Sequence, residues 1–128
     1  MKKILVSIRN GLLSEAIVRA LRDCGEFLPC KISPEVRANI SDHCETMGAD
    51  ILLMEISYVP GTTVEARLRE IRQIRSSNSG CKVVILCDDN AAPEIARKVT
   101  QLKKDRVIDA FFYTSVTENY LMSALVSL

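Results

Sequence analysis

The chain of 128 residues has no apolar run near the roughly 20 residues that a membrane span needs. Residues 1–6 are basic and then apolar, but this run is too short for the core of a signal peptide, because residues 7–10 end it. We therefore expect a cytoplasmic protein that does not contact membranes.

The sequence also has no large excess of positive or negative charge. The formal net charge is only +1, which gives no global electrostatic basis for binding nucleic acid. The main basic cluster consists of four arginines in one segment, Arg67, Arg69, Arg72 and Arg75. Glutamates at positions 65 and 70 interrupt it, as is typical of a solvated helix face. We expect no direct binding of nucleic acid by this chain.

Motifs of metal and nucleotide sites are missing as well. None of the five cysteines is part of a CxxC pair or of a zinc-ligand spacing, and His43 is the only histidine. There is no GxGxxG and no Walker motif. An odd number of cysteines without a signal sequence indicates reduced, mostly buried thiols. His43 lies in a polar helical stretch, so we expect it at the surface.

What the sequence does contain is a regular alternation of two patterns. Apolar segments predict strands at about residues 3–8, 27–32, 51–56, 82–87 and 107–113. Apolar residues at helical spacing predict helices at about 12–23, 33–47, 64–75, 93–104 and 117–128. Ser33 with Pro34, and Thr63, suit helix starts, and Gly25 and Gly48 suit helix ends.

Strands that alternate with helices predict a parallel sheet covered on both faces. The 51–56 and 82–87 segments lack polar alternation, as strands buried on both faces do. Pro29 argues that its strand lies at an edge. The predicted fold class is α/β, a three-layer flavodoxin-like (βα)5 domain over residues 1–128. Its five-stranded parallel sheet has the order 2-1-3-4-5.

Four segments carry a resemblance to a known family: residues 2–6, 10–13, 48–55 and 108–112. In order and spacing they resemble the receiver domain of two-component response regulators, the CheY-like family, over essentially the whole chain. The 48–55 segment looks like the strand that ends in the family's phosphoacceptor Asp. The 108–112 segment looks like the approach to its conserved lysine. The resemblance implies a signal-transduction domain, which could be the N-terminal part of a longer regulator.

The resemblance also implies where the phosphorylation site would lie. The family uses an acidic pair for Mg²⁺, a phosphoacceptor Asp, a Thr or Ser, and a Lys followed by Pro. These positions fall on residues of other types, namely Ile8 and Arg9, Glu55, Cys87, Thr114 and Ser115. Mg²⁺ prefers hard oxygen ligands, usually including one or two carboxylates. We therefore expect a degenerate pseudo-receiver that is not an enzyme, has no cofactor and binds no Mg²⁺.

Three hypotheses concern single residues of this altered site. The Arg9 guanidinium could pair with the Glu55 carboxylate and stand where the metal would be. Glu55 could instead act as a fixed imitation of an acyl-phosphate. The Cys87 thiol could be reactive at the mouth of the site if Arg9 lay near, although a small apolar residue at a strand end explains it more simply.

The leading function is a non-enzymatic module that contacts a protein partner or an output domain. A homodimer could use the fourth helix, fifth strand and fifth helix, a surface that the family commonly uses. One alternative is a phosphoaccepting receiver that uses Glu55 or another acid, such as Asp88 or Asp89, with unusual metal geometry. Another is a flavodoxin-like binder of small ligands, although the loop after the first strand has only one glycine.

Overall fold

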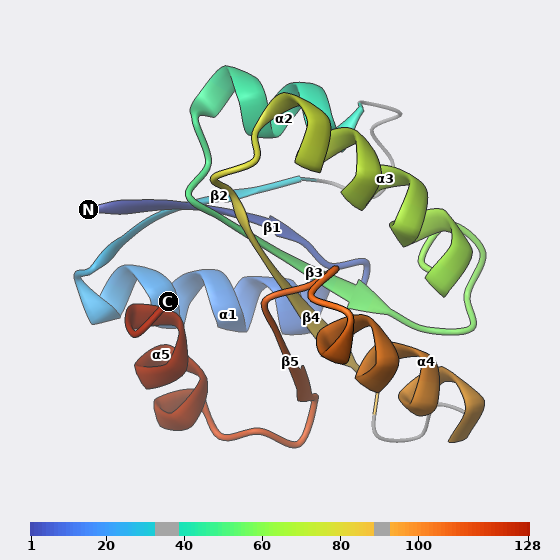
Figure 1. The fold of residues 1–128 in the computed structure, drawn as a ribbon. Coiled ribbons are helices and arrows are strands. Elements are labelled where there is room, and N and C mark those ends of the chain that lie inside the picture. The colour runs from blue at the N-terminus through green and yellow to red at the C-terminus, as the bar shows by residue number, and fades with distance from the viewer. Residues whose placement is uncertain (33–38, 89–92) are drawn as a thin grey trace.

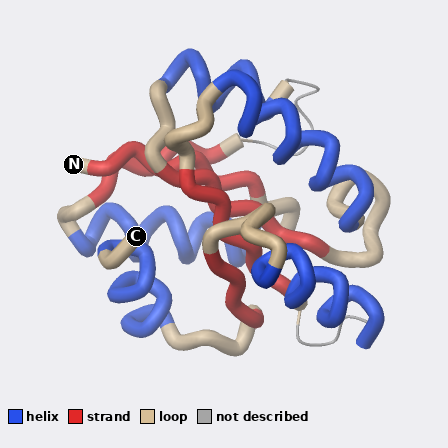
Figure 2. The backbone as a smooth tube through the Cα atoms, viewed as in Figure 1, coloured by secondary structure: helices blue, strands red, loops and turns tan. Residues whose placement is uncertain are grey.

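A computed structural model describes residues 1–32, 39–88 and 93–128. The strands are β1 (Lys2–Ser7), β2 (Phe27–Lys31), β3 (Ile51–Ile56), β4 (Lys82–Cys87) and β5 (Ala110–Tyr113). The helices are α1 (Gly11–Cys24), α2 (Ile40–Met47), α3 (Val64–Ser77), α4 (Pro93–Lys104) and α5 (Glu118–Val126). The chain alternates between the two kinds of element, as Figure 2 shows in colour.

The five strands form one parallel sheet in the order β2-β1-β3-β4-β5, which confirms the predicted topology. Helices α1 and α5 cover one face, and α2, α3 and α4 cover the other (Figure 1). Each face has its own apolar core. The central strands alternate between the two cores, because successive side chains point to opposite faces. The weaker strand β2 lies at an edge and contains Pro29, as expected.

Helix ends follow the predicted capping residues where the structure describes them. The side chain of Thr63 accepts a hydrogen bond from the Ala66 amide at the start of α3. Gly48 ends α2 with a φ of 64°, a left-handed conformation that favours glycine. The predicted helix start at Ser33 and Pro34 lies outside the described residues, and α2 is instead capped by Asn39.

The fifth strand is shorter than its apolar pattern suggests. It begins at Ala110, whereas the sequence predicts a strand from Val107. The amides of Val107 and Ile108 both donate to the Leu102 carbonyl, so these residues close α4 instead of pairing with β4. Their apolar side chains fill the core beneath the turn, which explains why the segment resembles a strand in the sequence.

All five cysteines are free thiols, and three of them are buried, namely Cys44, Cys81 and Cys87. A hydrogen bond with Cys81, together with burial, raises the pKa of the Cys44 thiol far above its ordinary value. No helix among the described residues is long and apolar enough to span a membrane.

Candidate functional site

The carboxyl ends of the strands border a cleft of about 500 Å³. Its lining includes Arg9, Asn10, Glu55, Tyr58, Asp88 and Thr114. Open α/β sheets usually bind their ligands at this edge. Three of the residues singled out from the sequence, Arg9, Glu55 and Thr114, therefore come together at one site.

Two other singled-out residues, Ile8 and Cys87, are core residues. Ile8 is buried in the apolar core beneath α1 and α5, and Cys87 is fully buried in the core on the opposite face. The Cys87 thiol thus lies inside the protein and not at the mouth of the cleft, contrary to the redox hypothesis. Its carbonyl accepts a hydrogen bond of 3.0 Å from the Thr114 amide, which joins the ends of β4 and β5. Ser115, the next residue, is exposed.

Arg9 and Glu55 do meet, but through a different contact from the predicted ion pair. The backbone amide of Arg9 donates a hydrogen bond to Oε1 of Glu55. The Arg9 guanidinium turns away and donates to the Pro60 carbonyl at 3.4 Å. The described residues contain no ion pair between Arg9 and Glu55. The prediction of a guanidinium–carboxylate pair was therefore wrong, because the turn after β1 places the Arg9 main chain nearest the carboxylate.

A different arginine supplies the buried cation of this edge. Arg67, in the first turn of α3, is only 3% exposed. Its Nε donates to the Glu55 carbonyl at 2.8 Å, and one terminal nitrogen donates to the Ser7 carbonyl at 3.0 Å. The other terminal nitrogen reaches Ser7 Oγ and Glu70 Oε1, both at 3.2 Å. One guanidinium thus fastens the ends of β1 and β3 to α3.

These contacts complete the hydrogen bonding of the sheet where its ladder ends. Beyond Ser7 the chain leaves β1, so Glu55 has no strand partner on that side. The Arg67 guanidinium donates to the Glu55 carbonyl, and the Glu55 carboxylate accepts from the Arg9 amide. The bond to the Glu55 carbonyl is partly buried, where an unpaired main-chain group is costly, whereas the bond to the Arg9 amide is exposed to solvent. Glu55 therefore serves as a structural cap at the end of β3.

The sequence-based interpretation missed Arg67, which was assigned to a solvated face with the other arginines. Arg69 and Arg72 are indeed exposed. A signal for Arg67 does exist in the helical spacing. Position 67 falls three residues after Val64 and four before Ile71, on the buried side of α3. A charged residue on the apolar stripe of a helix needs hydrogen-bond partners inside the protein. Its position on the stripe therefore marks Arg67 as a candidate buried cation.

Glu70 is the only carboxylate that the described contacts place on the Arg67 guanidinium. Burial raises the pKa of Glu70, and the neighbouring Arg67 charge opposes this shift. The positive charge of Arg67 is thus shared mainly among neutral carbonyl and hydroxyl oxygens. Neutral acceptors leave a buried charge less compensated than a carboxylate would.

The loop between β3 and α3 closes the cleft on one side and is internally hydrogen-bonded. Ser57 and Thr62 are joined by their main chains at 2.9 Å and by their hydroxyl groups at 2.7 Å. Gly61 allows the turn with a φ of 90°. The Pro60 carbonyl that accepts from Arg9 belongs to this loop, so the Arg9 side chain is held against it.

The sheet order and the helices on both faces define the CheY-like, flavodoxin-like fold of response regulator receiver domains. No family model matches the sequence, and no curated protein matches it. The fold assignment therefore rests on three-dimensional similarity.

Among solved structures, the chain is similar to a response regulator receiver domain protein from Clostridium thermocellum. The TM-score is 0.76 at 16% identity, over 99% of this chain and 93% of that one. It is also similar to the chemotaxis protein CheY4 of Vibrio cholerae, with a TM-score of 0.73 at 13% identity, over 98% and 96% of the two chains. A protein described as related to pilus assembly, from Burkholderia pseudomallei, gives 0.69 at 18% identity, over 98% and 87%. These similarities establish the fold, so the function must be argued from the site.

Proposed function

We propose that this chain is a receiver-like signalling module that acts through protein–protein contacts, without phosphorylation by the usual Asp and Mg²⁺ route. The observation that carries the proposal is the bonding of Glu55. Its carboxylate accepts the Arg9 amide, and its carbonyl accepts the buried Arg67 guanidinium. A residue committed in this way to closing the sheet is poorly placed to attack a phosphoryl group.

The groups around Glu55 also suit Mg²⁺ poorly. Mg²⁺ needs octahedral oxygen ligation, usually with one or two carboxylates. Ile8 is apolar and buried, Arg9 is cationic, and the guanidinium of Arg67 already occupies the carbonyl of Ser7. The residues present at the family's acidic positions do not fit the ion, and we propose that the module works without it.

We further propose the surface of α4, β5 and α5 as the place of contact with a partner, an output domain or a second copy. Tyr113 and Tyr120 are 42% and 63% exposed on it. The basic residues exposed on α4 are Arg97, Lys98, Lys103 and Lys104. Exposed tyrosine and arginine are the residue types here that protein interfaces favour.

A direct test is incubation of the intact chain with acetyl phosphate and Mg²⁺, followed by mass spectrometry. We expect no mass increase of one phosphoryl group, whereas a conventional receiver under the same conditions gains one. Stoichiometric phosphorylation that the Glu55→Gln substitution abolishes would refute the proposal.

One observation favours a second candidate, the phosphoaccepting receiver with a non-standard site. Asp88 and Glu55 line the same cleft, so two carboxylates face one space. Asp89, which the sequence also suggests, lies outside the described residues. In this case phosphorylation would persist in Glu55→Gln and would be lost in Asp88→Asn.

A further inference from the structure

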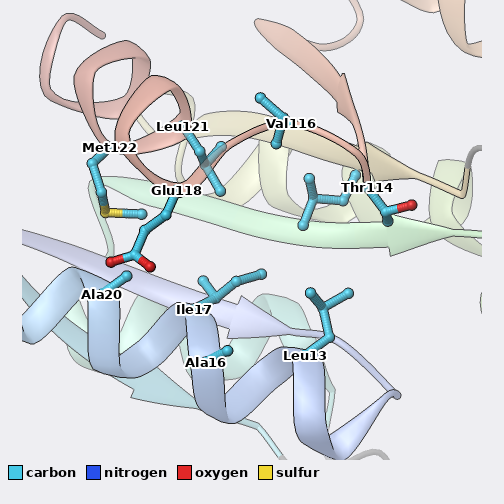
Figure 3. Close-up of a pocket in the computed structure, with 10 residues that line it drawn as sticks. Leu13, Ala16, Ile17, Ala20, Thr114, Val116, Glu118, Leu121 and Met122 are labelled. Carbon is cyan, nitrogen blue, oxygen red and sulfur yellow. The ribbon is translucent and has the colours of Figure 1, made fainter.

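A second and smaller pocket lies between α1 and α5 (Figure 3), and neither Arg9 nor Glu55 lines it. Its α1 wall consists of Leu13, Ala16, Ile17 and Ala20, and the opposite wall is formed by Glu118, Leu121 and Met122 of α5 with Val116 of the preceding turn. Ala16 and Ala20 are neighbours on one face of α1, because residues four apart lie one above the other. Their short side chains leave the space that forms the pocket.

The volume of the pocket limits what it can hold. It measures about 130 Å³. Sites for whole small-molecule ligands usually measure roughly 300–1,000 Å³. An apolar cavity of about 150 Å³ holds one benzene-sized group. The pocket therefore fits a single side chain better than a complete small ligand.

Glu118 gives this apolar pocket a charged rim. Figure 3 shows its side chain reaching from α5 toward α1, with the carboxylate on the Ala20 side of the pocket. None of the ion pairs among residues 1–32, 39–88 and 93–128 involves Glu118. Its place in the first turn of α5 suits a negative charge. The pocket thus combines apolar walls with a carboxylate that has no cationic partner in the described part of the chain.

We propose that this pocket is an anchor site for a lysine or arginine side chain of a partner protein. The aliphatic stem of such a side chain would pack between α1 and α5, while its charge would meet Glu118. Leu12, which is 82% exposed and one turn before Ala16, adds an apolar contact beside the pocket. Anchor side chains in pockets, arginine among them, carry much of the binding energy of protein interfaces. The pocket shares Leu13, Leu86 and Thr114 with the cleft, but Glu55 does not line it, and the inference does not rest on the function proposed above.

The first test uses a matched pair of probes, N-acetyl-arginine amide and N-acetyl-citrulline amide, which differ mainly in charge. The methyl resonances of Ala16 and Met122 report binding. We expect saturable shifts with the arginine probe, and roughly two- to fivefold weaker binding of the citrulline probe, as a rim ion pair contributes. Equal affinity for the two probes, or no saturable shift with the arginine probe, would overturn the proposal.

Variants locate the binding. Glu118→Gln should remove the preference for the arginine probe. Ala16→Leu, at an exposed helical position that tolerates leucine, should fill the pocket and abolish binding of both probes. Glu15→Gln, at an exposed glutamate of α1 outside the pocket, is the control and should bind as the unchanged chain does. A preference for arginine that survives Glu118→Gln would contradict the assignment.

The partner is tested by selecting a random peptide library against the unchanged chain, with Ala16→Leu as the counter-selection. The enriched peptides should share a lysine or arginine and should bind Glu118→Gln more weakly. Enriched peptides without a shared basic residue would refute the proposal. Light scattering of the chain alone tests whether a second copy of the chain occupies the pocket. A dimer that the Ala16→Leu substitution converts to a monomer would identify a second copy and overturn the assignment to another protein.

Discussion

Two arginines of α3, Arg67 and Arg75, hold opposite ends of the sheet. Arg67 binds the carbonyls of Ser7 and Glu55 at the carboxyl end. Arg75 binds the carbonyls of Cys81 and Val107 at the amino end, at 3.0 and 3.1 Å. Both side chains act as clamps that tie chain segments at the two ends of the sheet to the same helix.

The two clamps differ in depth and in their acidic partners. The Arg67 side chain is 4% exposed and that of Arg75 is 30% exposed. Arg75 forms a 2.9 Å ion pair with Asp109, whose carboxylate also accepts the Val83 amide. At the carboxyl end Arg67 pairs with Glu70 at 3.2 Å, and the carboxylate of Glu55 bonds a main-chain amide instead of the guanidinium. At the amino end of the sheet, Arg75 forms an ordinary, half-exposed ion pair. At the carboxyl end, Arg67 is a buried cation at the edge where open α/β sheets usually bind their ligands.

The largest expected effect is that of Arg67→Met, which keeps the aliphatic stem and removes every donor. The carbonyls of Ser7 and Glu55 would lose their partners inside the protein. We expect a loss of about 3–5 kcal/mol in the free energy of unfolding, measured by urea denaturation. Arg72→Met, at an exposed position of the same helix, is the control and should change it by less than about 0.5 kcal/mol. A similar small change for Arg67→Met would show that the clamp is dispensable.

Arg75→Met should have an intermediate effect. Water can reach the half-exposed groups that lose their partner, so we expect a loss of about 1–3 kcal/mol in the same measurement. A loss larger than that of Arg67→Met would reverse the ranking of the two ends.

Glu55→Gln should cost less, because the Gln side-chain oxygen can still accept the Arg9 amide. Only the charge assistance of the hydrogen bond is lost, about 1 kcal/mol in the free energy of unfolding. Binding to a partner protein separates this structural role from imitation of an acyl-phosphate. A cap that has only a structural role predicts the same affinity for Glu55→Gln and the unchanged chain, whereas a markedly weaker affinity would support the imitation.

The smallest effect concerns Glu70 and depends on pH. Burial raises the pKa of Glu70 above its usual value of 4.5, so the folded state favours its protonated form. The protonated Glu70 side chain contributes its full stabilisation below the pKa that Glu70 has in the unfolded chain. This stabilisation is lost as the pH rises through the pKa that Glu70 has in the folded chain. Glu70→Gln should therefore gain stability relative to the unchanged chain over this rise, by about 1 kcal/mol or less. Denaturation curves at several pH values check the sign, and a relative loss would contradict it.

Much of the fold could be predicted from the sequence, because local patterns determine it. Thr63 caps α3 where expected, α5 begins next to the predicted residue 117, and the apolar Ile51–Ile56 strand lies at the centre of the sheet. The fifth strand was predicted too long, since its first apolar residues close α4 instead. Periodicity alone cannot separate those two outcomes.

The site was predicted less well, because its contacts join residues far apart in the chain. The sequence brought Arg9 and Glu55 together correctly but assigned the contact to the wrong atoms of Arg9. Arg67 lies 60 positions from Ser7, and its neighbouring charges resemble those of a solvated face. Only the packing of α3 against the strand ends shows that one arginine of this cluster is buried.

The central claim is that Glu55 caps the sheet by bonding Arg9 and does not receive metal or phosphate. The backbone amide resonance of Arg9 reports that bond directly in a ¹⁵N-labelled sample. We predict that Mg²⁺ followed by beryllofluoride, a mimic of the phosphoryl group, leaves the resonances of Ser7, Arg9 and Glu55 unmoved. A saturable shift of the Arg9 amide that Glu55→Gln abolishes would contradict the account, because it would show the carboxylate leaving its cap to bind the added ions.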